Sequence, residues 1–211
     1  MTGRETVAQG LPPSSLIGFP ARALDTGAEV FRAHQADRAP WWFGNDGGGR
    51  FDLAAPQGTC YTALDAVSAL RERLGPVLGG RAALPESTLA EVVVSRLRLP
   101  ERRRAADLQS RAAASFGVTR ELESMVPYAV PQAWAQAFAD AGFGAVSYGP
   151  RFTPGECTAV ALFGPEGLAS WEGDPSPVPA QEISSGLRVW PTPRRADLSV
   201  VRPPRTRAVR G

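Results

Sequence analysis

The sequence is poor in the residues that build metal sites and disulfide frameworks. It contains one histidine, His34, and two cysteines, Cys60 and Cys157, which lie far apart and form no Cys-x-x-Cys pair. A zinc site or a disulfide scaffold is therefore not expected, and both cysteines are interpreted as reduced thiols in the core. We accordingly expect no metal cofactor.

Long apolar runs are also missing. No segment approaches the ~20 consecutive apolar residues that a membrane-spanning helix needs. The first residues lack the basic start and apolar middle of a secretory signal. With 211 residues, of which 43% are hydrophobic and 21% charged, the chain is expected to form one globular domain in the cytoplasm, without a membrane partner.

Lysine is absent, so 23 arginines oppose 21 acidic residues and give a net charge of +2. Arginine forks bind phosphates and carboxylates well, but the alanine excess and the single asparagine indicate a compositionally biased genome. Only individually placed arginines therefore count as evidence. The small net charge, without basic residues interleaved with aromatics, argues against nucleic-acid binding.

Short strands and short helices alternate unevenly along the chain. Hydrophobic periodicity predicts strands at 28–34, 58–63, 89–99, 145–148, 158–163 and 183–190, and helices at 66–74, 107–116 and 131–141. This order predicts an α+β fold rather than a regularly alternating parallel sheet. We expect an N-terminal extension (1–27), a central domain (28–190) and a Pro/Arg-rich tail (191–211).

The stretch from 31 to 74 gathers an unusual set of residue types. It holds two adjacent tryptophans, three consecutive glycines ending in Arg50, Tyr61, and a predicted helix that carries Glu72. Taken singly, each has an ordinary explanation. Periodicity alone makes Glu72 a solvated carboxylate, Tyr61 a core tyrosine and a lone arginine a surface residue.

Order and spacing change that interpretation. Arg32 on an early strand, a glycine-rich turn before Arg50-Phe51, and Tyr61 followed eleven residues later by Glu72 resemble the core of the RES domain family. Weaker similarities continue in order at 106–118, 128–135, 141–146, Arg151 and 162–163. The resemblance covers about residues 28 to 163.

The resemblance implies an ADP-ribosyltransferase-like fold, with short strands in two small sheets around an NAD cleft and flanking helices. Members of the family include toxins of bacterial toxin–antitoxin pairs that cleave the bond between nicotinamide and ribose, some with phosphate as acceptor. Relatives transfer ADP-ribose to a protein. For this chain the resemblance therefore implies NAD as a substrate and an antitoxin as a partner, with a homodimer as a further possibility.

The residue types suit that chemistry. Cleavage builds positive charge on the ribose, which a carboxylate at Glu72 can stabilise. Tyr61 can stack on nicotinamide, while Arg32 and Arg50 can grip the pyrophosphate. Backbone N–H groups of the turn at Gly49 can add anion binding. We expect the four side chains to line one cleft.

One departure from the family keeps a second interpretation open. Members of the family commonly carry a serine where Gly149 stands, and Ser147, two residues earlier on the predicted strand, would have to take its place as an NAD-binding residue. A non-catalytic RES-like module that binds a nucleotide or a partner protein is therefore the alternative. A gain of activity in Gly149→Ser is expected if the missing serine limits the enzyme. The acceptor, whether water, phosphate or a protein, stays open.

Overall fold

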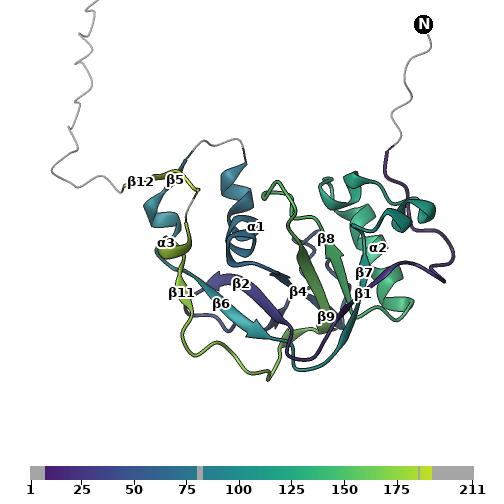
Figure 1. Cartoon of the computed structure of the whole chain (residues 1–211), viewed down its shortest axis with the longest axis horizontal. Coiled ribbons are helices and arrows are strands. Elements are labelled where there is room, and N and C mark those ends of the chain that lie inside the picture. The colour runs from purple at the N-terminus through teal and green to yellow at the C-terminus, as the bar shows by residue number, and fades with distance from the viewer. Residues whose placement is uncertain (1–7, 80–82, 185, 192–211) are drawn as a thin grey trace, which may run out of the picture.

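A computed structural model describes residues 8–79, 83–184 and 186–191 (Figure 1). It confirms the expected α+β class. The strands are β1 (Ala21–Leu24), β2 (Glu29–Gln35), β3 (Trp42–Phe43), β4 (Gln57–Ala63), β5 (Leu84–Pro85), β6 (Val92–Arg98), β7 (Arg103–Asp107), β8 (Ala145–Tyr148), β9 (Ala159–Pro165), β10 (Gly167–Leu168), β11 (Val178–Pro179) and β12 (Val189–Trp190). The helices are α1 (Ala66–Leu78), α2 (Ala129–Asp140) and the short α3 (Ala180–Ile183), with 3-10 turns η1 (Glu86–Thr88), η2 (Arg111–Phe116) and η3 (Arg120–Glu123).

One eight-stranded sheet organises the described residues, in the order β1-β7-β8-β9-β4-β2-β6-β11. The β4–β9 ladder runs antiparallel along the whole of β4, from Gln57 to Ala63. The β4–β2 boundary is matched at a single pair, Phe31 with Ala63. The two small sheets expected from the resemblance are thus two halves of one sheet, joined at a narrow boundary. Two further pairs, β3–β10 and β5–β12, form separate two-stranded sheets.

Both main helices cover the same face of this sheet. In β9, Ala159 and Ala161 pack with Trp134 and Phe138 of α2. Ala63 of β4 packs with α1 on that same face. Figure 1 shows α1 and α2 on one side of the curved sheet, with the β8–β9 connection between them.

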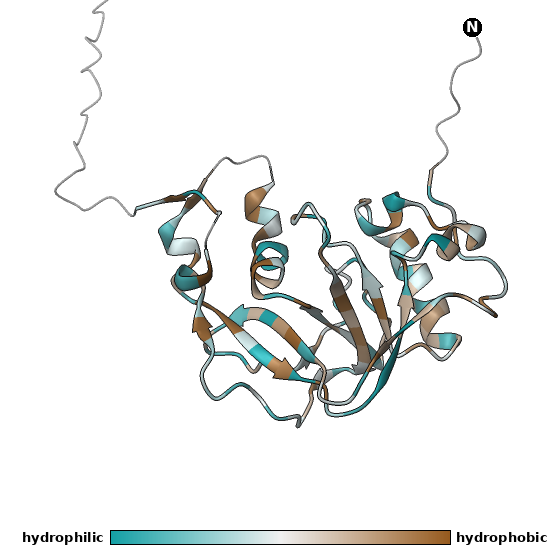
Figure 2. Cartoon of the chain, viewed as in Figure 1, coloured by the Kyte–Doolittle hydropathy of each residue, from teal (hydrophilic) through white to brown (hydrophobic). Residues whose placement is uncertain are grey.

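The other face has its own apolar layer, in which Val160 and Leu162 of β9 pack with Trp41 and Phe43. Figure 2 shows the central strands β8 and β9 as the most continuously hydrophobic part of the sheet. This matches the expectation that the apolar run at 158–163 is a central strand. None of the helices in the described ranges is long and apolar enough to cross a lipid bilayer.

Several element assignments differ from those expected. The helix predicted at 107–116 begins only after a strand, β7, and consists of the 3-10 turn η2, which ends at Gly117 with a φ of 84°. The strand predicted at 183–190 is confined to β12. The N-terminal extension contributes β1, which pairs with β7. Tertiary pairing decides these short segments, because local propensity alone is weak there. Residues 1–7 and 192–211, which include nearly all of the predicted tail, lie outside the described residues.

Helix α1 begins after its N-cap residue Asp65, whose side chain accepts a hydrogen bond from the Ser68 backbone N–H at 2.7 Å. Leu70 and Leu74 form its buried stripe. The helix continues beyond the expected end, through Pro76 to Leu78. It therefore presents a rigid scaffold for the residues on its exposed flank.

Removal of this cap should weaken the fold by a small, measurable amount. Asp65→Ala leaves the Ser68 N–H without its partner, so the free energy of unfolding should fall by about 1 kcal/mol. Urea denaturation followed by circular dichroism measures the change. Asp65→Ser, which keeps a capping oxygen, serves as the control and should recover most of the loss. Equal destabilisation by both variants would contradict the capping role.

Candidate functional site

A group of buried polar side chains lies on the helix-covered face of the sheet, near the boundary between its halves. Arg50 comes from the glycine turn, Glu72 from α1, Tyr148 from the end of β8, and Tyr128 from the residue before α2. The charges of Arg50 and Arg151 both lower the pKa of Glu72, while Glu72 raises that of Tyr148. These mutual effects place the groups within electrostatic reach of one another.

Arg50 is the most unusual member of the site. Its side chain belongs to a residue only 7% exposed, and its guanidinium lies 5.5 Å from the centre of the Tyr128 ring. Its Nε–H is buried without a hydrogen-bond partner among the described residues. A buried cationic donor left unpaired costs free energy. An arginine kept in this state is a group ready to bind an incoming acceptor.

Glu72 is half-buried rather than solvated. Burial raises its pKa above the ordinary 4.5, against the opposing effects of the Phe152 N–H and of the Arg50 and Arg151 charges. Its Oε1 accepts a hydrogen bond of 2.7 Å from the backbone N–H of Phe152. The ordinary expectation of a surface carboxylate therefore does not hold.

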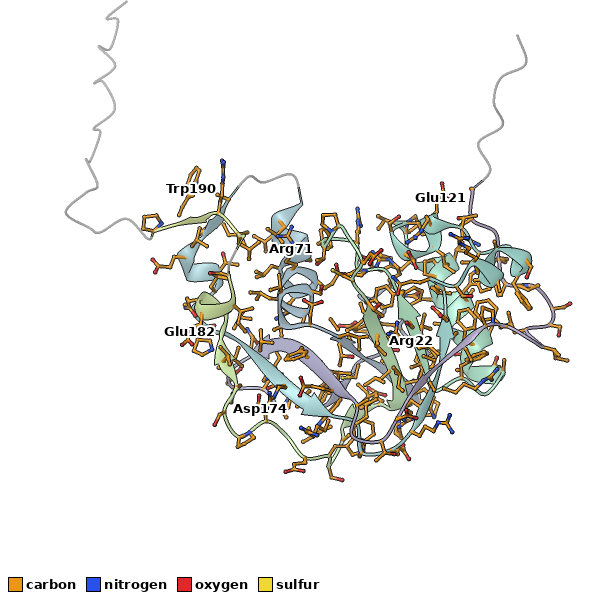
Figure 3. All side chains as sticks on the ribbon, in the orientation of Figure 1. Arg22, Arg71, Glu121, Asp174, Glu182 and Trp190 are labelled. Carbon is orange, nitrogen blue, oxygen red and sulfur yellow. The ribbon has the colours of Figure 1, made fainter. Side chains whose placement is uncertain are left out.

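The loop after β8 is fastened to α1 at Phe152. The Arg71 Nε donates to the Phe152 carbonyl at 2.7 Å, beside the bond from the Phe152 N–H to Glu72. Figure 3 labels Arg71 on α1, near that loop. The Phe152 ring packs on Gly75, where an added Cβ would lie 2.1 Å from a ring carbon. Glycine at position 75 therefore lets the loop approach closely enough to orient the Glu72 carboxylate.

Tyr148 was not expected from the sequence. Its side chain is buried, and burial, followed by the charge of Glu72, raises its pKa so that the phenol stays neutral. Its ring meets the Phe51 ring edge-on at 4.9 Å. Tyr148 thus brings a neutral hydroxyl-bearing side chain to the site, between the glycine turn and the end of β8.

A second carboxylate, Glu123, also escaped sequence reasoning. It is 5% exposed, accepts from the Gly149 N–H at 3.1 Å and pairs with Arg120 at 3.3 Å. Its charge is among the causes that raise the pKa of Tyr148. No local signal marked it, because its partner Gly149 lies 26 residues further along the chain.

Tyr61 lies on the expected strand, but its hydroxyl is fully engaged. It donates to Asp52 Oδ1 at 2.8 Å and accepts from the Phe51 N–H at 2.7 Å. Burial, with the nearby Asp52 charge, raises its pKa well above 10.0. The phenol therefore anchors the glycine turn. Its stacking on nicotinamide stays a prediction.

The glycine turn satisfies its own N–H groups. Gly49 N–H donates to Asp52 Oδ2 at 2.8 Å, and Gly48 N–H donates to Asp46 Oδ1 at 2.9 Å. A Cβ at position 49 would lie 2.3 Å from Asp52 Oδ1 and 2.4 Å from the Tyr61 hydroxyl oxygen. Gly49 is thus required for close packing, and its N–H is already bound within the protein. Its anion-binding role stays a prediction.

Arg32 is not brought together with the other expected site residues. The pair Phe31–Ala63 faces α1, so alternation along β2 turns Arg32 to the opposite face. There its guanidinium donates to the carbonyls of Pro40 and Trp42 and to the sulfur of Cys60. Arg32 therefore does not share one cleft with the other three side chains, and a cleft lined by Arg50, Tyr61 and Glu72 stays a prediction.

Ser147 and Gly149 are placed differently from the serine that the resemblance suggested. Ser147 pairs with Val160 on β9 and shares its orientation toward the far apolar layer, where its Oγ is buried. An added Cβ at Gly149 would lie 2.9 Å from Glu123 Oε2. A serine at position 149 would therefore compete with a carboxylate that already fills the space.

The other conspicuous residues lie apart from Arg50 and Glu72. His34 bonds to Ser95 Oγ at 2.8 Å and to the Gln35 carbonyl at 2.9 Å, and burial lowers its pKa, which favours the neutral ring. Trp41 is buried and packs edge-on against Trp171, whereas Trp42 is 52% exposed. Both cysteines are free, but only Cys60 lies in the core as expected, whereas Cys157 is half-buried. No three His, Cys, Asp or Glu side chains of the described ranges gather as metal ligands would.

Fold and site together define an α+β protein that buries an arginine, a glutamate and a tyrosine beside a glycine-rich turn. The family model of the RES domain matches residues 29–182, and the chain belongs to the RES domain family. No curated protein matches the sequence.

A solved relative shares this fold. It is the MbcT toxin in the crystal structure of the M. tuberculosis MbcT–MbcA toxin–antitoxin complex, with a TM-score of 0.54 at 16% sequence identity. The alignment covers 76% of this chain and 91% of that chain.

The fastening of the β8–β9 loop can be tested without reference to function. Gly75→Ala pushes against the Phe152 ring, so the bond from the Phe152 N–H to Glu72 should open more often. Hydrogen–deuterium exchange should then quicken at the Phe152 amide, by about tenfold if the bond costs about 1.4 kcal/mol to open.

Gly79→Ala is the matched control, because a Cβ there meets the nearest atom at an ordinary 3.7 Å. It should leave the exchange rate of the Phe152 amide unchanged. Unaltered exchange in Gly75→Ala would show that the loop does not depend on the absence of a side chain at position 75.

Proposed function

We propose that this chain is an NAD-consuming enzyme that cleaves the bond between nicotinamide and ribose, and that it acts as the toxin of a toxin–antitoxin pair in the cytoplasm. The observation that carries the proposal is the buried Arg50, with its unpaired Nε–H, in electrostatic reach of the half-buried Glu72. A cationic donor and a carboxylate in one partly buried site suit a substrate with an anionic pyrophosphate and with a positive charge that moves from nicotinamide to the ribose.

Glu72 is assigned the chemical step. When the glycosidic bond breaks, its electron pair leaves with the ring nitrogen of nicotinamide, and the ribose carbon becomes oxocarbenium-like. A carboxylate oriented by the Phe152 N–H stabilises that charge more strongly in the transition state than in bound NAD. The acceptor, water, phosphate or a protein side chain, then adds to the ribose carbon and releases a proton if it is neutral.

Arg50 and Tyr148 are assigned to binding. A guanidinium presents donors in a planar fork that matches the oxygens of a pyrophosphate. The neutral Tyr148 phenol can hydrogen-bond a ribose hydroxyl without adding charge to the site. Tyr61 acts through the turn that it anchors, and Arg32 through the strand and loop that it ties together.

An antitoxin chain is the proposed partner. The support is the structural neighbour, which was crystallised as a toxin–antitoxin complex, together with membership of the RES family. A partner that covers the site would keep a cell from losing its NAD. Whether the protein also self-associates is left to measurement of its mass in solution.

The second interpretation is a non-catalytic module that binds a nucleotide or a partner. It is favoured by Gly149, which stands where relatives commonly carry a serine, and by Glu123, which occupies the adjoining space. The two interpretations differ in one result. Purified protein that binds NAD but releases no nicotinamide, with water, phosphate or candidate protein acceptors present, is a binding module.

Replacement of the Glu72 carboxylate should separate chemistry from binding. Glu72→Gln keeps an oxygen that can accept the Phe152 N–H but loses the negative charge. Turnover should fall by about 100-fold or more, while NAD affinity stays within a few-fold. Nicotinamide release by chromatography and NAD affinity by calorimetry measure the two quantities on the same preparation.

The exposed acid Glu166 provides a control for surface charge, since it lies just after β9, at the end of the strand that is remote from α1. Glu166→Gln should leave turnover within twofold. If Glu72→Gln retained wild-type turnover, or lost NAD binding in proportion to turnover, the assignment of Glu72 to the chemical step would be wrong.

The pH dependence of turnover follows from the burial of Glu72. Its pKa lies above 4.5, and only the ionised form stabilises the ribose cation. As pH falls through this raised pKa, turnover should therefore decline with an acid limb positioned above pH 4.5. A pH profile of kcat/KM, which reports groups of the free enzyme, measures the limb. Its survival in the residual activity of Glu72→Gln would assign the titration to another group.

A further inference from the structure

Asp52 is a buried carboxylate with no assigned role. It is 7% exposed, and burial raises its pKa above the ordinary value in spite of its hydrogen bonds to Gly49 and Tyr61. Within the described ranges no arginine lies close enough to form an ion pair with it. A protein keeps such a group buried only where its hydrogen bonds compensate for lost hydration.

Those hydrogen bonds converge on the backbone around Arg50. Asp52 Oδ2 accepts from the Gly49 N–H at 2.8 Å, just before the arginine. Asp52 Oδ1 accepts from the Tyr61 hydroxyl at 2.8 Å, and that hydroxyl accepts from the Phe51 N–H at 2.7 Å, just after the arginine. The carboxylate thereby holds the chain on both sides of Arg50.

Two further contacts complete the enclosure of the turn. Gln132 on α2 donates to the Gly49 carbonyl at 2.9 Å, and the Thr59 hydroxyl on β4 donates to the Phe51 carbonyl at 2.8 Å. The backbone groups flanking Arg50 are thus bound from α2, β4 and the turn itself. Within the described turn around it, the Arg50 Nε–H is the buried side-chain donor that stays unpaired.

We propose that Asp52 is a positioning residue: through the Gly49 N–H and the Tyr61 hydroxyl it fixes the backbone on both sides of Arg50 and so aims the guanidinium at the anionic part of the ligand beside Glu72. The proposal rests on the function proposed above. It also gives Tyr61 a role as the link between Asp52 and the Phe51 N–H, in addition to any contact of its ring with the ligand. Asp52 itself touches no substrate.

The chemistry requires a carboxylate at this position. Two oxygens must accept from two different donors, the Gly49 N–H and the Tyr61 hydroxyl. An asparagine offers one accepting oxygen and places an NH₂ group against one of these donors. Asp52→Asn is therefore nearly the same size, yet it breaks one arm of the clamp and leaves the other.

A double-mutant cycle with Arg50 tests the proposal. If Asp52 acts through Arg50, Asp52→Asn should reduce kcat/KM for nicotinamide release by about tenfold or more in the wild-type background. The same change should cost less than about twofold once Arg50→Ala has removed the side chain being aimed. A purely structural role would give equal losses in both backgrounds, and that result would overturn the proposal.

Asp46→Asn is the matched control. Asp46 accepts from the Gly48 N–H at 2.9 Å in the same turn but binds neither peptide next to Arg50. Its kcat/KM should stay within about twofold of wild type. Urea denaturation of every variant shows whether a loss of activity comes from unfolding or from a misplaced Arg50 guanidinium. If Asp46→Asn lost as much activity as Asp52→Asn, the effect would not be specific to Asp52.

NAD binding in a Glu72→Gln background provides the second measurement. Calorimetry with NAD on the same cycle should show the same dependence on Arg50, since aiming the guanidinium does not need the chemical step. If the effects of Asp52→Asn and Arg50→Ala on NAD affinity are coupled but wild type releases no nicotinamide, the proposed reaction is refuted and the role of Asp52 is supported. If wild type releases nicotinamide but the effects of the two substitutions are additive, the role of Asp52 is refuted and the reaction is supported.

Discussion

The antiparallel ladder between β4 and β9 is the constraint on which the site depends. It sets which β4 side chains reach the helix-covered face, and it puts Tyr61 there and Cys60 on the other. Helix α1 begins two residues after the strand ends, at the Asp65 cap, so the height of Glu72 above the sheet follows from the ladder. Strand β8 pairs with the other edge of β9 and delivers Tyr148 to the same face. Tyr61, Glu72 and Tyr148, which are far apart in sequence, are therefore brought to one face of the sheet by the pairing of β4 with β9 and of β9 with β8.

The site concentrates buried charges that do not neutralise one another by direct contact. Arg50, Asp52 and Glu123 are each less than a tenth exposed, and Glu72 is half-buried. Among the described residues, the ion pair of Glu123 with Arg120 is the one direct pairing of these groups. Such an arrangement lowers the free energy of unfolding, because desolvation of each charge is only partly offset. The NAD molecule proposed above would offset part of this loss by completing the interactions of Arg50 and Glu72.

Local pattern was sufficient for part of this picture. Periodicity predicted β2, β4, α1, α2, β8 and β9, and order in the chain singled out Arg50, Tyr61 and Glu72. It failed where the answer depends on pairing. Arg32 was correctly placed on an early strand, but only the Phe31–Ala63 register shows that its side chain points away from α1. Glu123 and Tyr148 were missed because they meet the site through distant segments. Asp52 binds residues close to it in sequence, but no period in the sequence marks a buried carboxylate.

The absence of lysine, a matter of composition elsewhere in the chain, coincides with a physical requirement at position 50. A buried lysine loses its charge readily, because desolvation lowers its pKa, whereas a guanidinium stays protonated. A planar guanidinium can also lie over the Tyr128 ring while its edge donors remain available. A long arginine side chain loses conformational entropy when it is held in one direction. The backbone on both sides of Arg50 is fixed by hydrogen bonds to Asp52 and Tyr61. Gly49 allows this arrangement, because it has no Cβ to clash with these two side chains.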